Sequence, residues 1–323
     1  MPQAKPFYLQ PVNQKLIGIA LLALILVGLY MSIGVTDWAF SLPFRGRKAV
    51  AIILVGYAIA YSTVIFHTMT NNKILTPSII GLDALYILIQ TTLVFLFGGL
   101  FLTQLNPIVR FGLNVGLMLI FAGFLFTWLF GREGRHLYFL ILVGVVFGIF
   151  FGNVTNFMQK ILDPNEFSIL QGFLFASINN VDEELIWISV VAIAAVTLYS
   201  LRFFSQLDVI SLGREHALNL GVEHKQITNR LMIVITILVS VSTALVGPIT
   251  FFGLLVANLA YRYMGTYRHI YLIPAAVLMS LVALFGGQLI VERVFTFSTT
   301  LNVIVNFVGG IYFLMLLLRE QTI

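Results

Sequence analysis

Few side chains in this sequence are suited to acid–base, nucleophilic or metal chemistry. The chain has 323 residues, with 13 acidic residues, five histidines and no cysteine, so cysteine nucleophiles, disulfides and cysteine-based metal sites are excluded. His216 and His224 stand eight residues apart, which is not the spacing of a zinc-binding helix. The acids nearest to apolar stretches, Asp83 and the cluster 182–184, fall where helices are expected to begin, and the helix dipole stabilises acids there. We expect no catalytic residue and no metal ligands.

A nucleotide-binding loop is also missing from the sequence. The Walker signature requires Gly-Lys before Ser or Thr at the start of a helix, and the chain contains no Gly-Lys pair. Ion-coupled transporters usually carry ionised residues inside the bundle, whereas the acids here stand at predicted helix ends. We therefore interpret the chain as not an enzyme, and we expect any driving force to come from another subunit.

The composition is that of an integral membrane protein. Hydrophobic residues make up 59% of the chain and charged residues 10%, whereas soluble domains usually carry about 25% charged residues. The net charge of +5 arises from scattered Lys and Arg residues rather than from a basic run, so the partner surface is membrane lipid and not nucleic acid. No small-residue cleavage pattern follows the polar segment 1–15, so we expect the first apolar segment to be retained.

Apolar stretches of about twenty residues predict ten membrane crossings in one all-α domain, 1–323. A stretch at 231–261 is too long for one helix, and Gly247 and Pro248 divide it into two. The segment 167–181 is uncharged but short and polar, which indicates an interfacial or re-entrant element. The eight single crossings are 16–36, 49–72, 84–109, 111–131, 137–159, 185–201, 270–291 and 294–318.

Basic residues predict the orientation of the chain. With ten crossings and a cytoplasmic N-terminus, twelve Lys and Arg residues fall inside and six outside, as the positive-inside bias requires. Both termini are then cytoplasmic in a multi-pass protein. The six outside residues are Arg45, Arg47, Lys48, Arg110, Lys160 and Arg293.

The longest cytoplasmic connection contains a short amphipathic helix, within 207–221. Ser211 is suited to cap its start, and Gly221 is suited to the left-handed conformation that ends helices. Apolar and charged residues alternate between them. Two interpretations remain open: a helix that rests on the lipid surface, or a docking element for a cytoplasmic partner.

Four sequence blocks resemble the FecCD family, the permeases of iron-siderophore and cobalamin ABC importers. The pattern Gly213-x-x-x-Ala217-x-x-Leu220-Gly221 is similar to the coupling-helix motif that sits in a groove of the ATPase subunit. The blocks at 45–62, 71–81 and 247–262 are similar to three further family motifs, so that the likeness runs from about Arg45 to the C-terminus. The resemblance implies a type II ABC importer fold, and coupling to the ATPase through Ser211, Gly213, Arg214, Glu215, Ala217, Leu220 and Gly221.

Some residues depart from the family pattern. Asn258 stands where the family usually has His, Gly287-Gln288 replaces Ala-Asp, and 300–302 replaces Glu-Leu-Pro. These departures disfavour the cobalamin branch. The run 71–86 looks most like the permeases of anguibactin, vibriobactin and petrobactin importers, in which two different permease chains pair. A heterodimer is therefore implied.

The resemblance implies a transport function at the bacterial inner membrane. The chain would move a ferric siderophore, of catechol type, with a sister permease, two ATPase subunits that bind ATP and Mg, and a periplasmic or lipoprotein binding protein. This chain itself would hold no cofactor. Arg45, Lys48 and Arg293 would receive acidic residues of the binding protein, and an Arg at Ala217 is expected to crowd the face that docks on the ATPase.

Polar residues inside the predicted spans are candidates for the translocation pathway, because hydrocarbon makes them costly. For each of them, hydrogen bonding between helices is the competing interpretation. Two other functions are also kept open, an ion-coupled secondary transporter and a membrane scaffold or sensor without transport. The pathway candidates are His67, Gln90, Asn302 and Asn306.

Overall fold

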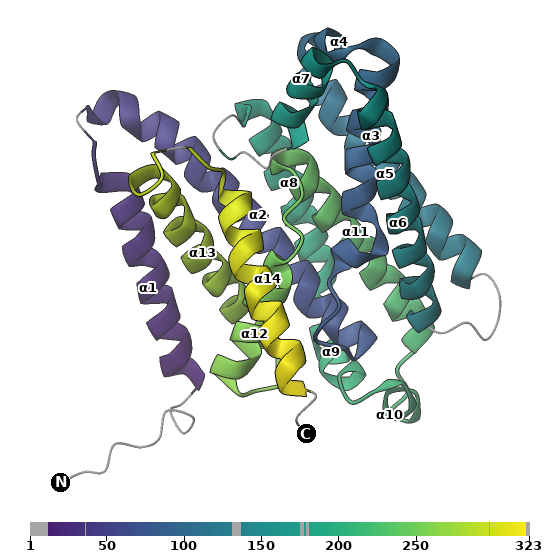
Figure 1. Ribbon diagram of the computed structural model, residues 1–323. Helices are drawn as coiled ribbons and strands as arrows, with labels where there is room; N and C mark the ends of the chain where they lie inside the picture. Colours follow the sequence, from purple (N-terminus) through teal and green to yellow (C-terminus); the bar gives the residue numbers. More distant parts are fainter. Residues whose placement is uncertain are drawn as a thin grey trace.

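Helices make up all the regular structure in the part of the chain that the computed structural model describes, residues 12–35, 37–130, 137–174, 178, 181–296 and 298–320 (Figure 1). A 3₁₀ helix, η2, and fourteen α-helices are assigned in these residues. Their bounds are α1 Val12–Ser32, α2 Trp38–Thr70, η2 Pro77–Ile80, α3 Leu82–Phe97, α4 Gly99–Gln104, α5 Pro107–Phe130, α6 Leu137–Ile161, α7 Pro164–Leu174, α8 Glu183–Leu201, α9 Phe204–Ile210, α10 Arg214–Asn219, α11 His224–Val246, α12 Phe252–Met264, α13 His269–Arg293 and α14 Leu301–Glu320.

The helix lengths agree with a multi-pass membrane protein. Among the described residues, seven helices are long and apolar enough to cross a bilayer: α1, α2, α5, α6, α8, α11 and α13. Two shorter apolar helices, α3 and α14, correspond to further predicted crossings. The predicted break at Gly247 and Pro248 is confirmed, because α11 ends at Val246 and α12 begins at Phe252. These nine helices and α12 correspond to the ten predicted crossings.

Two predicted spans have different bounds in the structure, one at its end and the other at its start. The stretch predicted as 84–109 is interrupted at Gly98, whose φ of +82° ends α3 and turns the chain into the short helix α4. The stretch predicted as 294–318 begins as a loop, in which Thr296 has a φ of +45°, and becomes helical only at Leu301. Both errors have one cause, since hydropathy measures how apolar a segment is and not where its backbone turns.

The predicted interfacial segment, 167–181, overlaps the short helix α7, which begins earlier, at Pro164. It has 11 residues, too few to cross a bilayer. Its Glu166 side chain accepts a hydrogen bond from the backbone nitrogen of Gly99, so it satisfies one of the free N–H groups at the start of α4. Residues 175–177, 179 and 180 of the predicted segment lie outside the described residues.

The centre of the bundle is formed by α2 and α11. About three quarters of each apolar window is buried, 78% in α2 and 72% in α11, whereas α1, α5, α6 and α8 are only 22–28% buried. The outer helices therefore turn most of their apolar surface to lipid or to another chain. The start of α1, the end of α14, α9 and α10 lie at one end of the bundle, and α4 and α7 lie at the opposite end (Figure 1).

Candidate functional site

The predicted coupling segment forms two short helices, α9 and α10, at the end of the bundle that also holds the start of α1 (Figure 1). The prediction that Ser211 caps the second helix is wrong. The N-cap of α10 is Gly213, with a φ of +100° and no side-chain hydrogen bond. Ser211 instead belongs to the end of α9, where its hydroxyl donates to the carbonyl oxygen of Asp208 at 2.6 Å. It thus satisfies a free carbonyl of the first helix rather than an N–H of the second.

The predicted stop at Gly221 is confirmed. Gly221 has a φ of +80°, and its backbone nitrogen donates to the carbonyl of Leu218 at 3.0 Å. The next nitrogen, of Val222, donates to the carbonyl of Ala217 at 3.0 Å. These two bonds are the pair that defines a Schellman motif, so the end of α10 has a fixed direction.

The two faces of α10 differ in what they contact. Ala217 is 0% exposed, so it faces the bundle and not a partner, and the expectation that Arg at this position would crowd the docked face is wrong. The outer surface carries Leu218 and Leu220, which are 50% and 63% exposed, beside the charged side chains of Arg214 and Glu215. This outer surface, with a shallow hollow of about 440 Å³ along Gly213 to His216, is the part available for docking.

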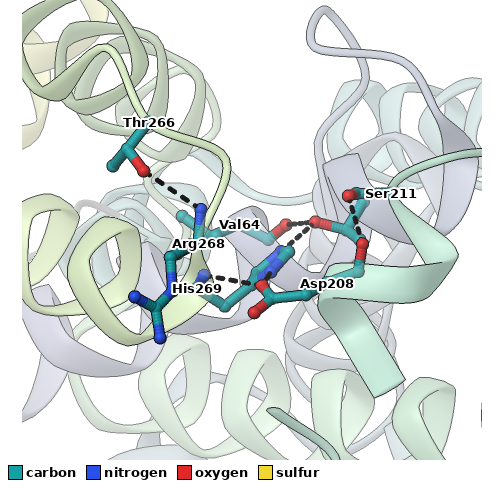
Figure 2. Close-up of polar contacts among 7 residues, drawn as sticks. Val64, Asp208, Ser211, Thr266, Arg268 and His269 are labelled. Carbon is teal, nitrogen blue, oxygen red and sulfur yellow. Dashed lines mark hydrogen bonds and ion pairs between the residues drawn. The ribbon is translucent and has the colours of Figure 1, made fainter. Parts of the chain in front are cut away.

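A polar cluster joins this segment to the transmembrane helices (Figure 2). The Asp208 carboxylate on α9 accepts a hydrogen bond from the backbone nitrogen of His269 at 2.8 Å and one from its Nδ1 at 2.6 Å. His269 is the first residue of α13, so Asp208 caps that helix from another element and places a negative charge at its positive end. Movement of α9 is therefore tied to the start of α13.

The cluster continues from His269 into α2. The other ring nitrogen, Nε2, is hydrogen bonded to the hydroxyl of Thr68 at 2.7 Å, and Thr68 also contacts the carbonyl of Val64 at 3.0 Å (Figure 2). Both His269 and Thr68 are buried. Asp208, His269 and Thr68, here called the α9–α13–α2 cluster, thus connect the coupling segment to the central helix of the bundle.

The three basic residues predicted to receive the binding protein lie at the opposite end of the bundle, but they are not equally accessible. Arg45 donates to the carbonyl of Tyr30 and lies 3.8 Å from the carboxylate of Glu292. Lys48 is buried, with its Nζ 4.1 Å from the ring centroid of Phe44. Arg293 is exposed and donates to the carbonyl of Ile33.

Another exposed cation at that end is Arg47. It lies 3.7 Å from Glu183, and both side chains are largely open to solvent. An exposed ion pair contributes little free energy, so Arg47 can leave Glu183 and contact another molecule at low cost. Arg47 and Arg293 are therefore the more exposed cations at this end, while Arg45 and Lys48 are less exposed and are held in contacts within the chain.

The four pathway candidates lie on three different helices. Asn306 donates to Asn302 at 2.6 Å within α14, and its oxygen is 3.5 Å from the backbone nitrogen of Phe251. Gln90 is buried on α3. His67 packs against the ring of Tyr261 and lines a cavity of about 420 Å³ that Lys73 and Thr266 also line. The structure thus joins the two asparagines, and their role in a pathway stays a prediction.

Comparison with known proteins decides the family. The model of the FecCD transport family matches residues 15–319. This chain belongs to the FecCD transport family. It is 50% identical over 310 residues to the petrobactin import system permease protein YclO of Bacillus subtilis, covering 96% of this chain and 98% of that protein. It is 35% identical over 316 residues to the petrobactin import system permease protein FatC of Bacillus anthracis, covering 94% and 89%.

The fold of this FecCD protein also matches a solved structure. An inward-facing ABC transporter of the metal-chelate type aligns with a TM-score of 0.82, at 19% identity, over 96% of this chain and all of that one. At this identity the match establishes the fold alone. The chain is therefore a multi-pass permease with the architecture of an ABC importer, as the sequence motifs implied.

Sequence reasoning did not find the α9–α13–α2 cluster of this FecCD protein. Asp208 and His269 are 61 residues apart, and neither stands in a recognisable short motif. The available signal was a His directly after Arg268, at the start of the apolar stretch that forms α13. The sequence alone does not show which residue that His contacts.

Proposed function

We propose that this chain is the membrane-spanning permease subunit of an ABC importer for ferric petrobactin. The observation that carries the proposal is the 50% identity to a petrobactin permease along 310 residues. A pathway contacts its substrate through many side chains on several helices. Identity spread along nearly the whole chain therefore supports a shared substrate class better than a single motif does.

Energy enters through contact between α10 and a cytoplasmic ATPase, which binds ATP and Mg. Leu218 and Leu220 supply exposed apolar contacts, and Arg214 and Glu215 flank them with charge. The α9–α13–α2 cluster ties the same segment to α13 and α2 through hydrogen bonds of 2.6–2.8 Å to His269. Displacement of α10 on ATP binding then reaches the central helix through groups already in contact.

A second, different permease chain completes the pathway. Two Bacillus subtilis proteins similar to this chain, YclO and YclN, both have names that describe petrobactin permeases, and YclN is 24% identical over 291 residues. Helix α14 offers a face for such a partner, because apolar side chains spaced three or four residues apart are exposed along it. They are Val303, Phe307, Ile311, Leu314 and Leu318.

In the bilayer, the end with α9 and α10 faces the cytoplasm, together with the start of α1 and the end of α14. The opposite end, with Arg47 and Arg293, faces the siderophore-binding protein. The distribution of twelve basic residues against six supports this orientation. Complementary charge at the outer end would steer the loaded receptor into register.

Purification from native membranes followed by reconstitution tests the function. We expect the chain to carry with it an ATPase and a sister permease, and the proteoliposomes to take up radioactive iron as ferric petrobactin only when ATP is supplied on the ATPase side. Uptake driven by a sodium or proton gradient without nucleotide would establish the secondary-transporter alternative. Absence of uptake with receptor, ATP and ferric petrobactin all present would favour a scaffold or sensor.

A further inference from the structure

A buried carboxylate lies deep in the bundle, away from the coupling segment. Asp83 is in the first turn of α3 and is only 7% exposed. Two residues earlier, a Cβ on Gly81 would lie 3.0 Å from the nitrogen of Gly148 and 3.1 Å from the oxygen of Gly144, both near the middle of α6. Asp83 is thus about half way through the membrane-spanning part, where an uncompensated charge is expensive.

Oxygen atoms of neutral side chains surround this carboxylate. The hydroxyl of Thr250 is 3.3 Å from Oδ2 of Asp83, and the hydroxyls of Ser78 and Thr243 interact with the same group. Ser62 and Ser242 also line the space beside it. Within the described residues that line this space, none is Lys, Arg or His, so the carboxylate has no cationic side chain there to offset its charge.

The space next to Asp83 is a small cavity, and one of the hydroxyl groups that line it has no hydrogen-bond partner. Its volume is about 10 Å³, close to the room that a single water molecule requires. Thr63 lines it from α2, is 1% exposed, and its hydroxyl oxygen has no hydrogen-bond partner. A Cβ at position 253 would collide with this hydroxyl, so Gly253 on α12 leaves it room. A buried hydroxyl without a partner is costly unless something occupies the cavity.

Helix ends of both signs lie at the cavity, because the first turns of α3 and α12 line it through Asp83 and Gly253, and the last turns of α11 line it through residues 242 and 243. Helix α11 ends at Val246, and an irregular segment containing Gly247 and Pro248 leads to α12. Residues 242, 243, 249 and 250 on both sides of this break line the cavity. The negative end of the α11 dipole therefore faces it, as the ends of broken helices do at cation sites in membrane transporters.

We propose that Asp83, together with Thr63, Ser78, Thr243 and Thr250, binds a sodium ion that holds the start of α3 to the break between α11 and α12. The oxygen-only ligands select a hard cation rather than a transition metal. A single carboxylate balances one positive charge, and a cavity of about 10 Å³ leaves no room for a hydration shell, so the ion is held by the protein oxygens alone. The ion is structural, so it requires no sodium gradient.

Thermal unfolding of the purified importer complex tests this site independently of transport. We expect the melting temperature to rise with sodium chloride along a saturating one-site curve, and not with potassium or choline chloride at matched ionic strength. Asp83→Asn should abolish the sodium-specific rise. Asp37→Asn is the matched control, since Asp37 also stands at a helix start but is exposed, and this variant should keep the rise.

Thr63→Val distinguishes a bound ion from simple packing. Because the Thr63 hydroxyl has no partner in the protein, its removal should leave the complex at least as stable as the wild type in sodium-free buffer. With sodium, the variant should require about tenfold more ion for half of the stabilisation, because one ligand is lost. Its curve remains informative if Asp83→Asn does not fold.

Three results would overturn the proposal. They are equal melting temperatures of the wild type in sodium, potassium and choline, an undiminished sodium response in Asp83→Asn, or an unchanged sodium requirement in Thr63→Val. A failure of ferric petrobactin uptake would leave these melting curves unaffected, so the sodium site and the transport function are tested separately.

Discussion

The carboxylate of Asp208 binds His269 twice, through the backbone nitrogen at 2.8 Å and through Nδ1 at 2.6 Å. One side chain therefore fixes both the first turn of α13 and the direction of the imidazole ring. Since Asp208 lies on α9, the helix that leads into α10, the coupling segment cannot shift without moving α13 or breaking these bonds. Hydrogen bonds to a charged acceptor are among the stronger polar contacts in proteins.

Substitution of Asp208 should separate its hydrogen bonds from its negative charge. Asp208→Ala loses both and is expected to destabilise the folded complex by about 2–3 kcal/mol. Both bonds reach the same oxygen, Oδ1, so Asp208→Asn can keep both while it loses the charge, and it should lose about half as much stability. Thermal unfolding measures the stability, and the ratio of iron imported to ATP hydrolysed measures coupling. Equal unfolding of Ala, Asn and wild-type proteins would contradict the capping role.

The hydroxyl of Thr68 links the cluster to α2, and Thr236 provides a matched control. Both threonines are buried and donate to the carbonyl four residues earlier, at 3.0 Å in Thr68 and 2.8 Å in Thr236. Thr68 also contacts His269. Thr68→Val should therefore cost about 1–2 kcal/mol and lower the iron-to-ATP ratio, because a buried ring nitrogen loses its partner. Thr236→Val should change the ratio little; a similar drop in both variants would show that the link to His269 has no special role.

The end of α10 depends on one backbone conformation. Gly221 has a φ of +80°, and a Cβ at this position would meet no atom within 4 Å, so any cost of adding one comes from the backbone. Gly221→Ala should thus cost about 1 kcal/mol, and Gly221→Val more. We expect both to weaken co-purification with the ATPase. Gly152→Ala is the control, because this helical glycine on α6 also has open space and no positive φ.

The sequence predicted those features that depend on local physics. The length of apolar segments predicted the spans, the Gly247-Pro248 pair predicted the break between α11 and α12, and Gly221 predicted the helix stop. Each of these depends on a residue's own backbone preference or on its own hydrophobicity.

Features that depend on contacts between distant segments were missed. Ser211 has the right type for an N-cap, but α9, which was not predicted, ends at that point and uses its hydroxyl. In a helix as short as α10, the apolar pattern did not show that Ala217 faces inward and Leu218 outward. The burial of Asp83 is likewise a property of α2, α11 and α12, which surround it.

The two faces of α10 give opposite predictions for the same kind of substitution. Leu218 is exposed, so Leu218→Arg should leave the permease as stable as the wild type while ATPase binding in pull-down falls at least tenfold. Ala217 is fully buried, so Ala217→Arg should destabilise the permease itself by several kcal/mol. Normal ATPase binding by Leu218→Arg would mean that α10 rests on lipid instead.

The orientation can be tested directly because the chain has no native cysteine. Arg47 and Arg214 are both exposed basic residues at opposite ends of the bundle, so single cysteines at these positions report the two sides. In intact cells stripped of any outer membrane, Arg47→Cys should react with an impermeant thiol reagent, because the proposed orientation places this end away from the cytoplasm. Arg214→Cys should react only after permeabilisation. If Arg214→Cys were labelled in intact cells instead, α10 would be outside, and no cytoplasmic ATPase could dock on it.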